Sequence, residues 1–124
     1  MLRNKCILVV EDEPLIGLDI LLTLEEAGAS VEGPYRSIAE TLSKIEQCPA
    51  DDGFDGAVLD YRLLDGTCEP IIQQLKRYGI PMILHSGNAE QLSKTGETLK
   101  IEVVSKPSHP TTLLQALERC VRVN

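Results

Sequence analysis

Four apolar runs of the sequence each end in polar residues, and the chemistry of these residues suits the binding of a cation and a phosphoryl group. The polar residues are Glu11 and Asp12 after the first run, Asp60 after the second, Ser86 and Gly87 after the third, and Lys106 and Pro107 after the fourth. In a parallel α/β sheet, the carboxyl ends of the strands border the crevice in which ligands bind. We therefore expect carboxylates, a hydroxyl and an ammonium to meet in one pocket. Such a set would hold a divalent cation and a phosphoryl group against a carboxylate.

The alternation of strand-like and helix-like segments predicts the sheet that would bring these residues together. Apolar runs with strand character cover residues 6–10, 54–59, 80–84 and 101–104, and a weaker one covers 30–32. Segments with helical character follow, over 14–26, 38–45, 71–78, 89–94 and from Pro110 onward. Five such alternations predict a parallel sheet that is covered by helices on both faces.

Local sequence signals predict the ends of two helices. Pro14 suits the first turn of the first helix, and Gly28 would end that helix. Thr67 follows the turn residue Gly66 and is a candidate N-cap for the third helix.

Length and composition favour one globular domain. The chain has 124 residues, of which 43% are hydrophobic and 25% charged, and a net charge of −7. The negative charge argues against binding to nucleic acid, because phosphate backbones require a basic protein face. No apolar stretch is long enough to span a membrane, and no signal peptide opens the chain. The four cysteines show no C-x-x-C spacing, which favours reduced thiols and therefore the cytoplasm.

The polar residues at the ends of the apolar runs resemble those of the receiver domains of two-component response regulators, the family of the chemotaxis protein CheY. The resemblance covers essentially the whole chain. Glu11 and Asp12 match the acidic pair of the family, Asp60 its phosphoacceptor, Ser86 its Thr or Ser, and Lys106 with Pro107 its Lys-Pro pair. The resemblance implies a flavodoxin-like (βα)5 fold, a three-layer sandwich with the strand order 2-1-3-4-5. It also implies one receiver domain over residues 1–124, with no output domain.

In such a domain, the carboxylate of Asp60 would take a phosphoryl group from a sensor histidine kinase or a histidine phosphotransfer protein. Mg²⁺ prefers oxygen ligands, and Mn²⁺ would substitute for it. Asp12, Asp60 and the backbone carbonyl of Arg62 would bind the ion directly, and Glu11 would bind it directly or through water.

The remaining site residues would contact the phosphoryl group. Ser86 would donate a hydrogen bond to it, Gly87 would leave room for it, and Lys106 would neutralise its charge. The resemblance suggests a cis peptide bond before Pro107, which would orient Lys106. The chain would catalyse only its own phosphorylation and dephosphorylation. It would signal through an unidentified protein target, and a homodimer is one possibility.

Three positions depart from the family pattern. Val103 replaces the Tyr or Phe that often lies three residues before the lysine, so an output through rotation of an aromatic side chain is not expected. Leu64 stands where many relatives carry proline. Arg62, two residues after the phosphoacceptor, could pair with Asp65 or Glu11 in the resting state.

Two other classes of protein remain as alternatives. A haloacid-dehalogenase-like phosphatase also uses Asp, Ser or Thr, and Lys around Mg²⁺. That family needs a second Asp two residues after the nucleophile, where this chain has Arg62, and it places its acidic pair after the lysine. The second alternative is a receiver-shaped interaction module that never carries phosphate. A dinucleotide-binding domain is excluded, because no G-x-G-x-x-G follows the first strand.

Two further features lie outside this set of residues. His85 is expected to pack beside the sheet, and together with His109 and the scattered cysteines it does not make a zinc site. Apolar residues cover more than half of the circumference of the helix predicted over 14–26. This pattern fits either an unusually buried helix or a docking or dimer surface beside the acidic pocket.

Overall fold

Five parallel strands form the central sheet of the protein. The computed structural model describes residues 2–47, 53–87, 101–106 and 108–121. The strands of the sheet are β1 (Cys6–Val10), β2 (Ser30–Tyr35), β3 (Gly56–Leu59), β6 (Met82–Ser86) and β7 (Glu102–Ser105). Their order is β2-β1-β3-β6-β7, and every neighbouring pair is parallel. Because β6 and β7 are the fourth and fifth strands of this sheet along the chain, the predicted order 2-1-3-4-5 is confirmed.

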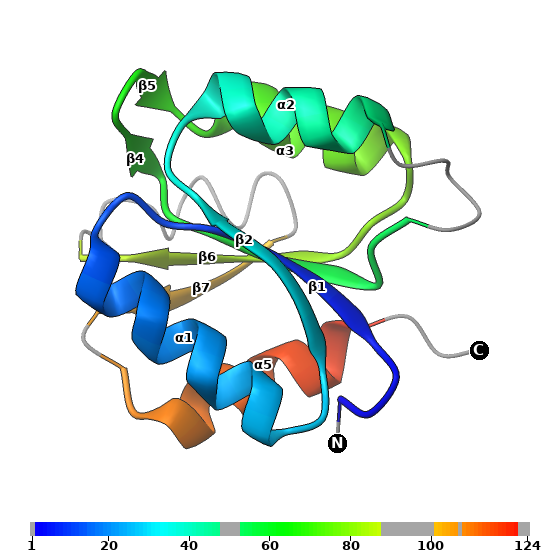
Figure 1. The fold of residues 1–124 in the computed structure, drawn as a ribbon, viewed down its shortest axis with the longest axis vertical. Coiled ribbons are helices and arrows are strands. Elements are labelled where there is room, and N and C mark those ends of the chain that lie inside the picture. Colours follow the sequence, from blue (N-terminus) through cyan, green and yellow to red (C-terminus); the bar gives the residue numbers. More distant parts are fainter. Residues whose placement is uncertain (1, 48–52, 88–100, 107, 122–124) are drawn as a thin grey trace.

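Helices cover both faces of the sheet, as the sequence predicts. The helices α1 (Pro14–Glu26) and α5 (Pro110–Cys120) lie on one face, and α2 (Ile38–Gln47) and α3 (Glu69–Arg77) lie on the other (Figure 1). The helix predicted over 89–94 falls outside the described residues. None of the helices in the described part of the chain is both long and apolar enough to cross a membrane.

The side chains of each strand alternate between two hydrophobic clusters, one under each pair of helices. Leu8, for example, packs toward α2 and α3, whereas Ile7 and Val9 pack toward α1 and α5. Successive residues of a strand point to opposite faces, so a strand that is apolar throughout can fill both clusters. This explains why the central strands read as continuous apolar runs.

The helix α1 begins and ends where the sequence predicts, but its buried face is narrow. Pro14 lies in the first turn, and Gly28 follows the last turn with a φ of +94°. Gly17, Ile20 and Leu24 are the buried residues of the helix. The large apolar side chains that remain exposed on it are Leu15, Leu18 and Leu22, at 82%, 48% and 53% exposure. The interpretation of α1 as an unusually buried helix is therefore wrong.

A short hairpin that the sequence did not predict follows β3. Its strands are β4 (Arg62–Leu63) and β5 (Gly66–Thr67). The prediction of Thr67 as an N-cap is wrong, because Thr67 belongs to β5 and α3 begins at Glu69. The hairpin is attached to the start of α2, because the carboxylate of Asp65 accepts the backbone N–H groups of Ile38 and Ala39 at 2.7 and 3.2 Å. Asp65 thus satisfies two N–H groups at the start of α2 that have no partner within the helix.

The strand β2 extends three residues beyond the predicted 30–32 and supports the residue that follows β1. Gly33 has a φ of +108°, and a Cβ at this position would lie 2.4 Å from the backbone oxygen of Val9. Only glycine allows the two strands to approach this closely. Beyond it, the carbonyl of Tyr35 accepts the backbone N–H of Glu11 at 2.8 Å.

Candidate functional site

Three carboxylates meet at the carboxyl end of the two central strands. Glu11 and Asp12 follow β1 and Asp60 follows β3, and the pairing of Val10 with Leu59 places these ends side by side. One carboxylate oxygen from each of the three residues lies within 4.8 Å of the others. Glu11 is 2% exposed and Asp60 is 8% exposed, so their charges are largely removed from water.

Lys106 supplies the positive charge at this cluster. Its Nζ lies 2.6 Å from Oε1 of Glu11 and 3.3 Å from Oδ2 of Asp60. Burial alone would lower the pKa of Lys106, but its contacts with the two carboxylates outweigh this effect and raise the pKa. The ammonium is therefore charged at neutral pH. Lys106 and Glu11 thus form a close and largely buried ion pair.

The phosphoacceptor candidate has a strongly perturbed carboxyl group. Burial, followed by the charge of Glu11 and a hydrogen bond with it, raises the pKa of Asp60 from 3.8 to about 7, although Lys106 opposes the increase. Two carboxylates close together in a poorly hydrated site resist simultaneous ionisation. A bound cation would favour the ionised form of Asp60.

This arrangement fits a divalent cation that prefers oxygen ligands. Three carboxylates converge here, and one ammonium, that of Lys106, lies against two of them. Mg²⁺ typically binds one or two protein carboxylates together with water and phosphate oxygens. Glu11, Asp12 and Asp60 therefore fit the predicted metal site. Arg62 begins β4 just beyond Asp60, and the role of its backbone carbonyl as a ligand stays a prediction.

Ser86 and Lys106 are brought together by the pairing of the two strands at one edge of the sheet. Ser86 ends β6 and is 5% exposed, and its carbonyl accepts the backbone N–H of Lys106 at 2.8 Å. Gly87 is exposed, and a Cβ built on it would meet nothing within 4 Å. The role of Gly87 in leaving room for a phosphoryl group stays a prediction. Pro107 and the predicted cis peptide bond lie outside the described residues.

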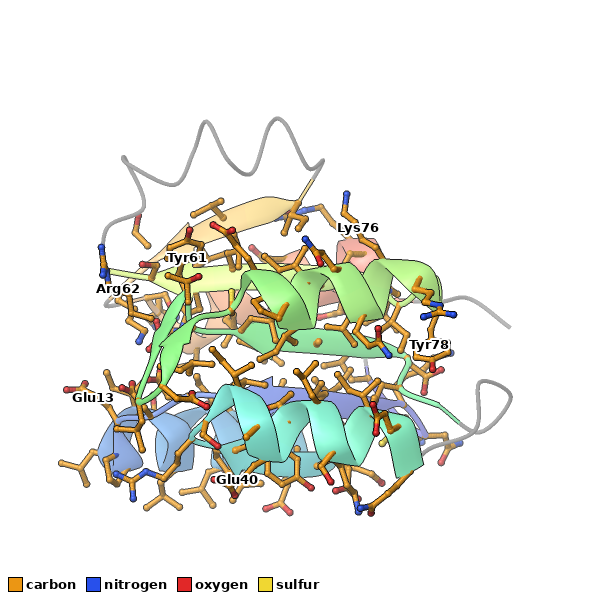
Figure 2. All side chains as sticks on the ribbon, turned by 90° about the horizontal axis from the view of Figure 1, so that it is seen from above. Glu13, Glu40, Tyr61, Arg62, Lys76 and Tyr78 are labelled. Atoms are coloured by element: carbon orange, nitrogen blue, oxygen red, sulfur yellow. The ribbon has the colours of Figure 1, made fainter. Side chains whose placement is uncertain are left out.

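Arg62 makes neither of the two ion pairs that were considered for it. Asp65 is engaged by the start of α2, and Glu11 is paired with Lys106. The Arg62 side chain is exposed and lies with Tyr61 and Glu13 at one end of the molecule, whereas Lys76 and Tyr78 lie at the other (Figure 2). Arg62 thus stays available at the end of the sheet that carries the carboxylates.

Two residues that the sequence reasoning missed also contact this end of the sheet. Nε of Arg36 donates a hydrogen bond to the backbone carbonyl of Asp12 at 3.3 Å. The buried thiol of Cys68 has its pKa raised to about 12, first by burial and then by the charge of Asp60. Cys68 is therefore protonated and unreactive at neutral pH. Neither residue carries a local sequence signal, because both contacts depend on the tertiary fold.

Comparison with known proteins finds relatives that match most of the length of the chain at low sequence identity. No protein-family model matches the chain. The phyllosphere-induced regulator PhyR of Methylorubrum extorquens is 25% identical over 118 residues, which cover 93% of this chain. The chain spans 43% of the length of this curated relative.

Solved structures of receiver domains are also similar to this chain, over nearly its full length. The non-phosphorylated HemR receiver domain of Leptospira biflexa is 28% identical with a TM-score of 0.81, over 98% of this chain and 97% of that one. A CheY-like response regulator receiver domain protein of Methanospirillum hungatei is 28% identical with a TM-score of 0.79, over 93% of this chain and 91% of that one. The sheet order and these relatives support a receiver domain, because the chain has the fold of CheY-like response-regulator receiver domains and is similar to them over nearly its full length.

Proposed function

We propose that this receiver domain accepts a phosphoryl group on the carboxylate of Asp60. The observation that carries the proposal is the position of Lys106, whose Nζ lies 3.3 Å from Oδ2 of Asp60 at the edge of a three-carboxylate cluster. A structural ion pair would need only one acidic partner. The excess of carboxylates around one ammonium instead suits a site that also binds a divalent cation.

The proposed reaction is the transfer of a phosphoryl group from a phosphohistidine to Asp60. An oxygen of the Asp60 carboxylate attacks the phosphorus, the bond between phosphorus and the histidine nitrogen breaks, and the electron pair leaves with the imidazole. The product is an aspartyl phosphate. Lys106 would then turn from Glu11 and Asp60 toward the new phosphate oxygens, and Ser86 would donate its hydroxyl to one of them.

The proposed metal ligands are Glu11, Asp12, Asp60 and the backbone carbonyl of Arg62. Bound Mg²⁺ would neutralise charge on the phosphoryl oxygens as the phosphoryl group is transferred. The chain's own contribution would be to hold Asp60 in line with the donor, with Lys106 partly opposing the rise in the pKa of Asp60. Mn²⁺ should substitute for Mg²⁺ and serves as a spectroscopic probe.

A labelling experiment tests the proposed phosphorylation. The protein is incubated with Mg²⁺ and acetyl phosphate, and its intact mass is measured. The wild type and Asp19→Asn, which changes an exposed carboxylate on α1, should each gain one phosphoryl group, whereas Asp60→Asn should gain none. Equal labelling of all three proteins would refute the assignment. Absence of label on the wild type would favour the alternative of an interaction module.

We also propose that the exposed leucines of α1 contribute to docking of the histidine phosphodonor, a sensor kinase or a phosphotransfer protein. Leu15, Leu18 and Leu22 are exposed on the helix that begins directly after the acidic pair. A donor bound there would bring its phosphohistidine close to Asp60. Leu18→Ser and Leu22→Ser should slow transfer from a phosphohistidine protein without slowing labelling by acetyl phosphate. The proposed setting is the cytoplasm, with an unidentified protein as the downstream target.

A further inference from the structure

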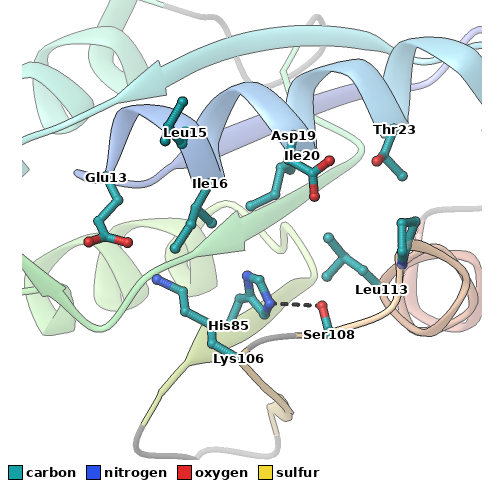
Figure 3. Close-up of a pocket in the computed structure, with 11 residues that line it drawn as sticks. Glu13, Leu15, Ile16, Asp19, Ile20, Thr23, His85, Lys106, Ser108 and Leu113 are labelled. Carbon is teal, nitrogen blue, oxygen red and sulfur yellow. Dashed lines mark hydrogen bonds between the residues drawn. The ribbon is translucent and has the colours of Figure 1, made fainter.

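A cavity lies beside the carboxylate cluster, between α1 and α5. Its volume is about 480 Å³. Its buried lining residues are Ile20, Leu113 and His85, at 3%, 3% and 4% exposure. The exposed residues Glu13, which directly precedes α1, and Asp19 of α1 also border it. Figure 3 shows α1 on one side of the cavity and His85 with Ser108 on the opposite side. The cavity is therefore apolar along its walls and polar at two separate places.

The first polar place is His85 on β6, which packs beside the sheet as predicted. Its Nε2 lies 2.9 Å from Oγ of Ser108, and its Nδ1 is buried with no hydrogen-bond partner among the described residues. Burial, followed by the charge of Lys106, lowers the pKa of His85 to about 4, so the ring is neutral at pH 7. In Figure 3, the second ring nitrogen points away from Ser108, toward α1. A buried polar atom without a partner is unfavourable, and a ligand with a matching hydrogen-bonding group would satisfy it.

The second polar place is the side of α1, where the carboxylates of Glu13 and Asp19 border the cavity. Glu13 and Asp19 have no ion-pair partner among the residues that the structure describes. Lys106 is the cationic residue among the described lining, and its Nζ already lies against Glu11 and Asp60. The open side of the cavity is therefore negative and favours a cation.

We propose that this cavity binds a small aromatic amine that carries a hydroxyl at the far end of its ring. The ammonium lies near Asp19, the ring packs against Ile20 and Leu113, and the hydroxyl bonds to Nδ1 of His85. A hydroxyl suits either neutral tautomer of His85, because it both donates and accepts hydrogen bonds. The proposed contacts of the amine involve neither Asp60 nor Lys106, so the existence of this site does not rest on the proposed function of Asp60.

Tyramine is a suitable probe, and two truncated analogues separate its contacts. Phenethylamine lacks the hydroxyl, and 4-ethylphenol lacks the amine. In two-dimensional NMR titrations of the metal-free protein, tyramine should shift the signals of Asp19, Thr23, His85 and Ser108. Both analogues should bind more weakly than tyramine. No shift around the cavity at millimolar tyramine would overturn the proposal, as would equal affinity for tyramine and 4-ethylphenol.

Variants of exposed residues test the same contacts without endangering the fold. Asp19→Asn should weaken tyramine about fivefold, equivalent to about 1 kcal/mol for one charge pair near water, and leave 4-ethylphenol unchanged. The matched control is Glu25→Gln, which changes an exposed carboxylate of α1 that does not line the cavity. Glu25→Gln should leave both affinities unchanged. Equal weakening of tyramine and 4-ethylphenol by Asp19→Asn would contradict the proposed placement of the ammonium.

Discussion

Replacing Asp60 by asparagine should stabilise the metal-free protein, and the gain should grow with pH. Asparagine resembles the neutral carboxyl group, whereas ionised Asp60 is buried beside Glu11. Because folding raises the pKa of Asp60 from 3.8 to about 7, the native state favours the protonated form. That stabilisation is fully present below pH 3.8 and is lost as the pH rises through 7. One pKa unit corresponds to about 1.4 kcal/mol, so the advantage of Asp60→Asn should increase by about 3 kcal/mol between pH 5 and pH 8.

Urea unfolding of the wild type and the variant at both pH values measures this difference. EDTA keeps the proteins free of metal, and the exposed carboxylate of Asp19 provides the control variant Asp19→Asn. The control should change the free energy of unfolding by less than about 0.5 kcal/mol at either pH, as is usual for surface substitutions. Addition of Mg²⁺ at pH 8 should stabilise the wild type but not Asp60→Asn. A difference between Asp60→Asn and the wild type that is the same at pH 5 and pH 8 would show that Asp60 ionises normally, and the electrostatic account of the site would be wrong.

Three further substitutions test separate parts of the structure. Asp12→Ala should weaken the binding of Mn²⁺, measured by titration, with little loss of stability, because it removes one of several crowded carboxylates; unchanged affinity would place the metal elsewhere. Gly33→Ala should lower the free energy of unfolding by about 2 kcal/mol or more, because alanine at a positive φ is strained and its Cβ would meet the oxygen of Val9; a neutral effect in urea unfolding would contradict the described path of β2. Lys106→Met should destabilise the metal-free protein at pH 8 by about 3 kcal/mol, because it leaves Glu11 buried without its cation; a thermal unfolding curve that matches the wild type would show that the pair contributes nothing.

Most of the sheet could be predicted from the sequence, because each central strand is a continuous apolar run that serves both hydrophobic clusters. The hairpin after β3 could not be predicted. Its position depends on Asp65, which bonds to Ile38 and Ala39 more than 25 residues earlier in the chain. A contact between residues so far apart in the sequence leaves no local sequence pattern. From local sequence alone, the Gly66-Thr67 pair therefore predicts the start of a helix. The sequence also could not show which face of α1 is buried, because it does not specify which leucines pack against the sheet and the neighbouring helix.

Part of the candidate site could be predicted from the sequence, and part of it could not. The meeting of Glu11, Asp12 and Asp60 follows from the general rule that parallel strands end at one edge of the sheet. The direct contact of Lys106 with Glu11, and the high pKa of Asp60 that accompanies it, depend on side-chain burial that the sequence does not specify.

Chemical trapping of the phosphorylated residue tests the central claim most directly. The protein is treated with acetyl phosphate and Mg²⁺ and is then reduced with borohydride, which converts an aspartyl phosphate to homoserine. Peptide sequencing by mass spectrometry should find homoserine at position 60 in the treated wild type and none when acetyl phosphate is omitted. Homoserine at another aspartate, with Asp60 intact, would contradict the account.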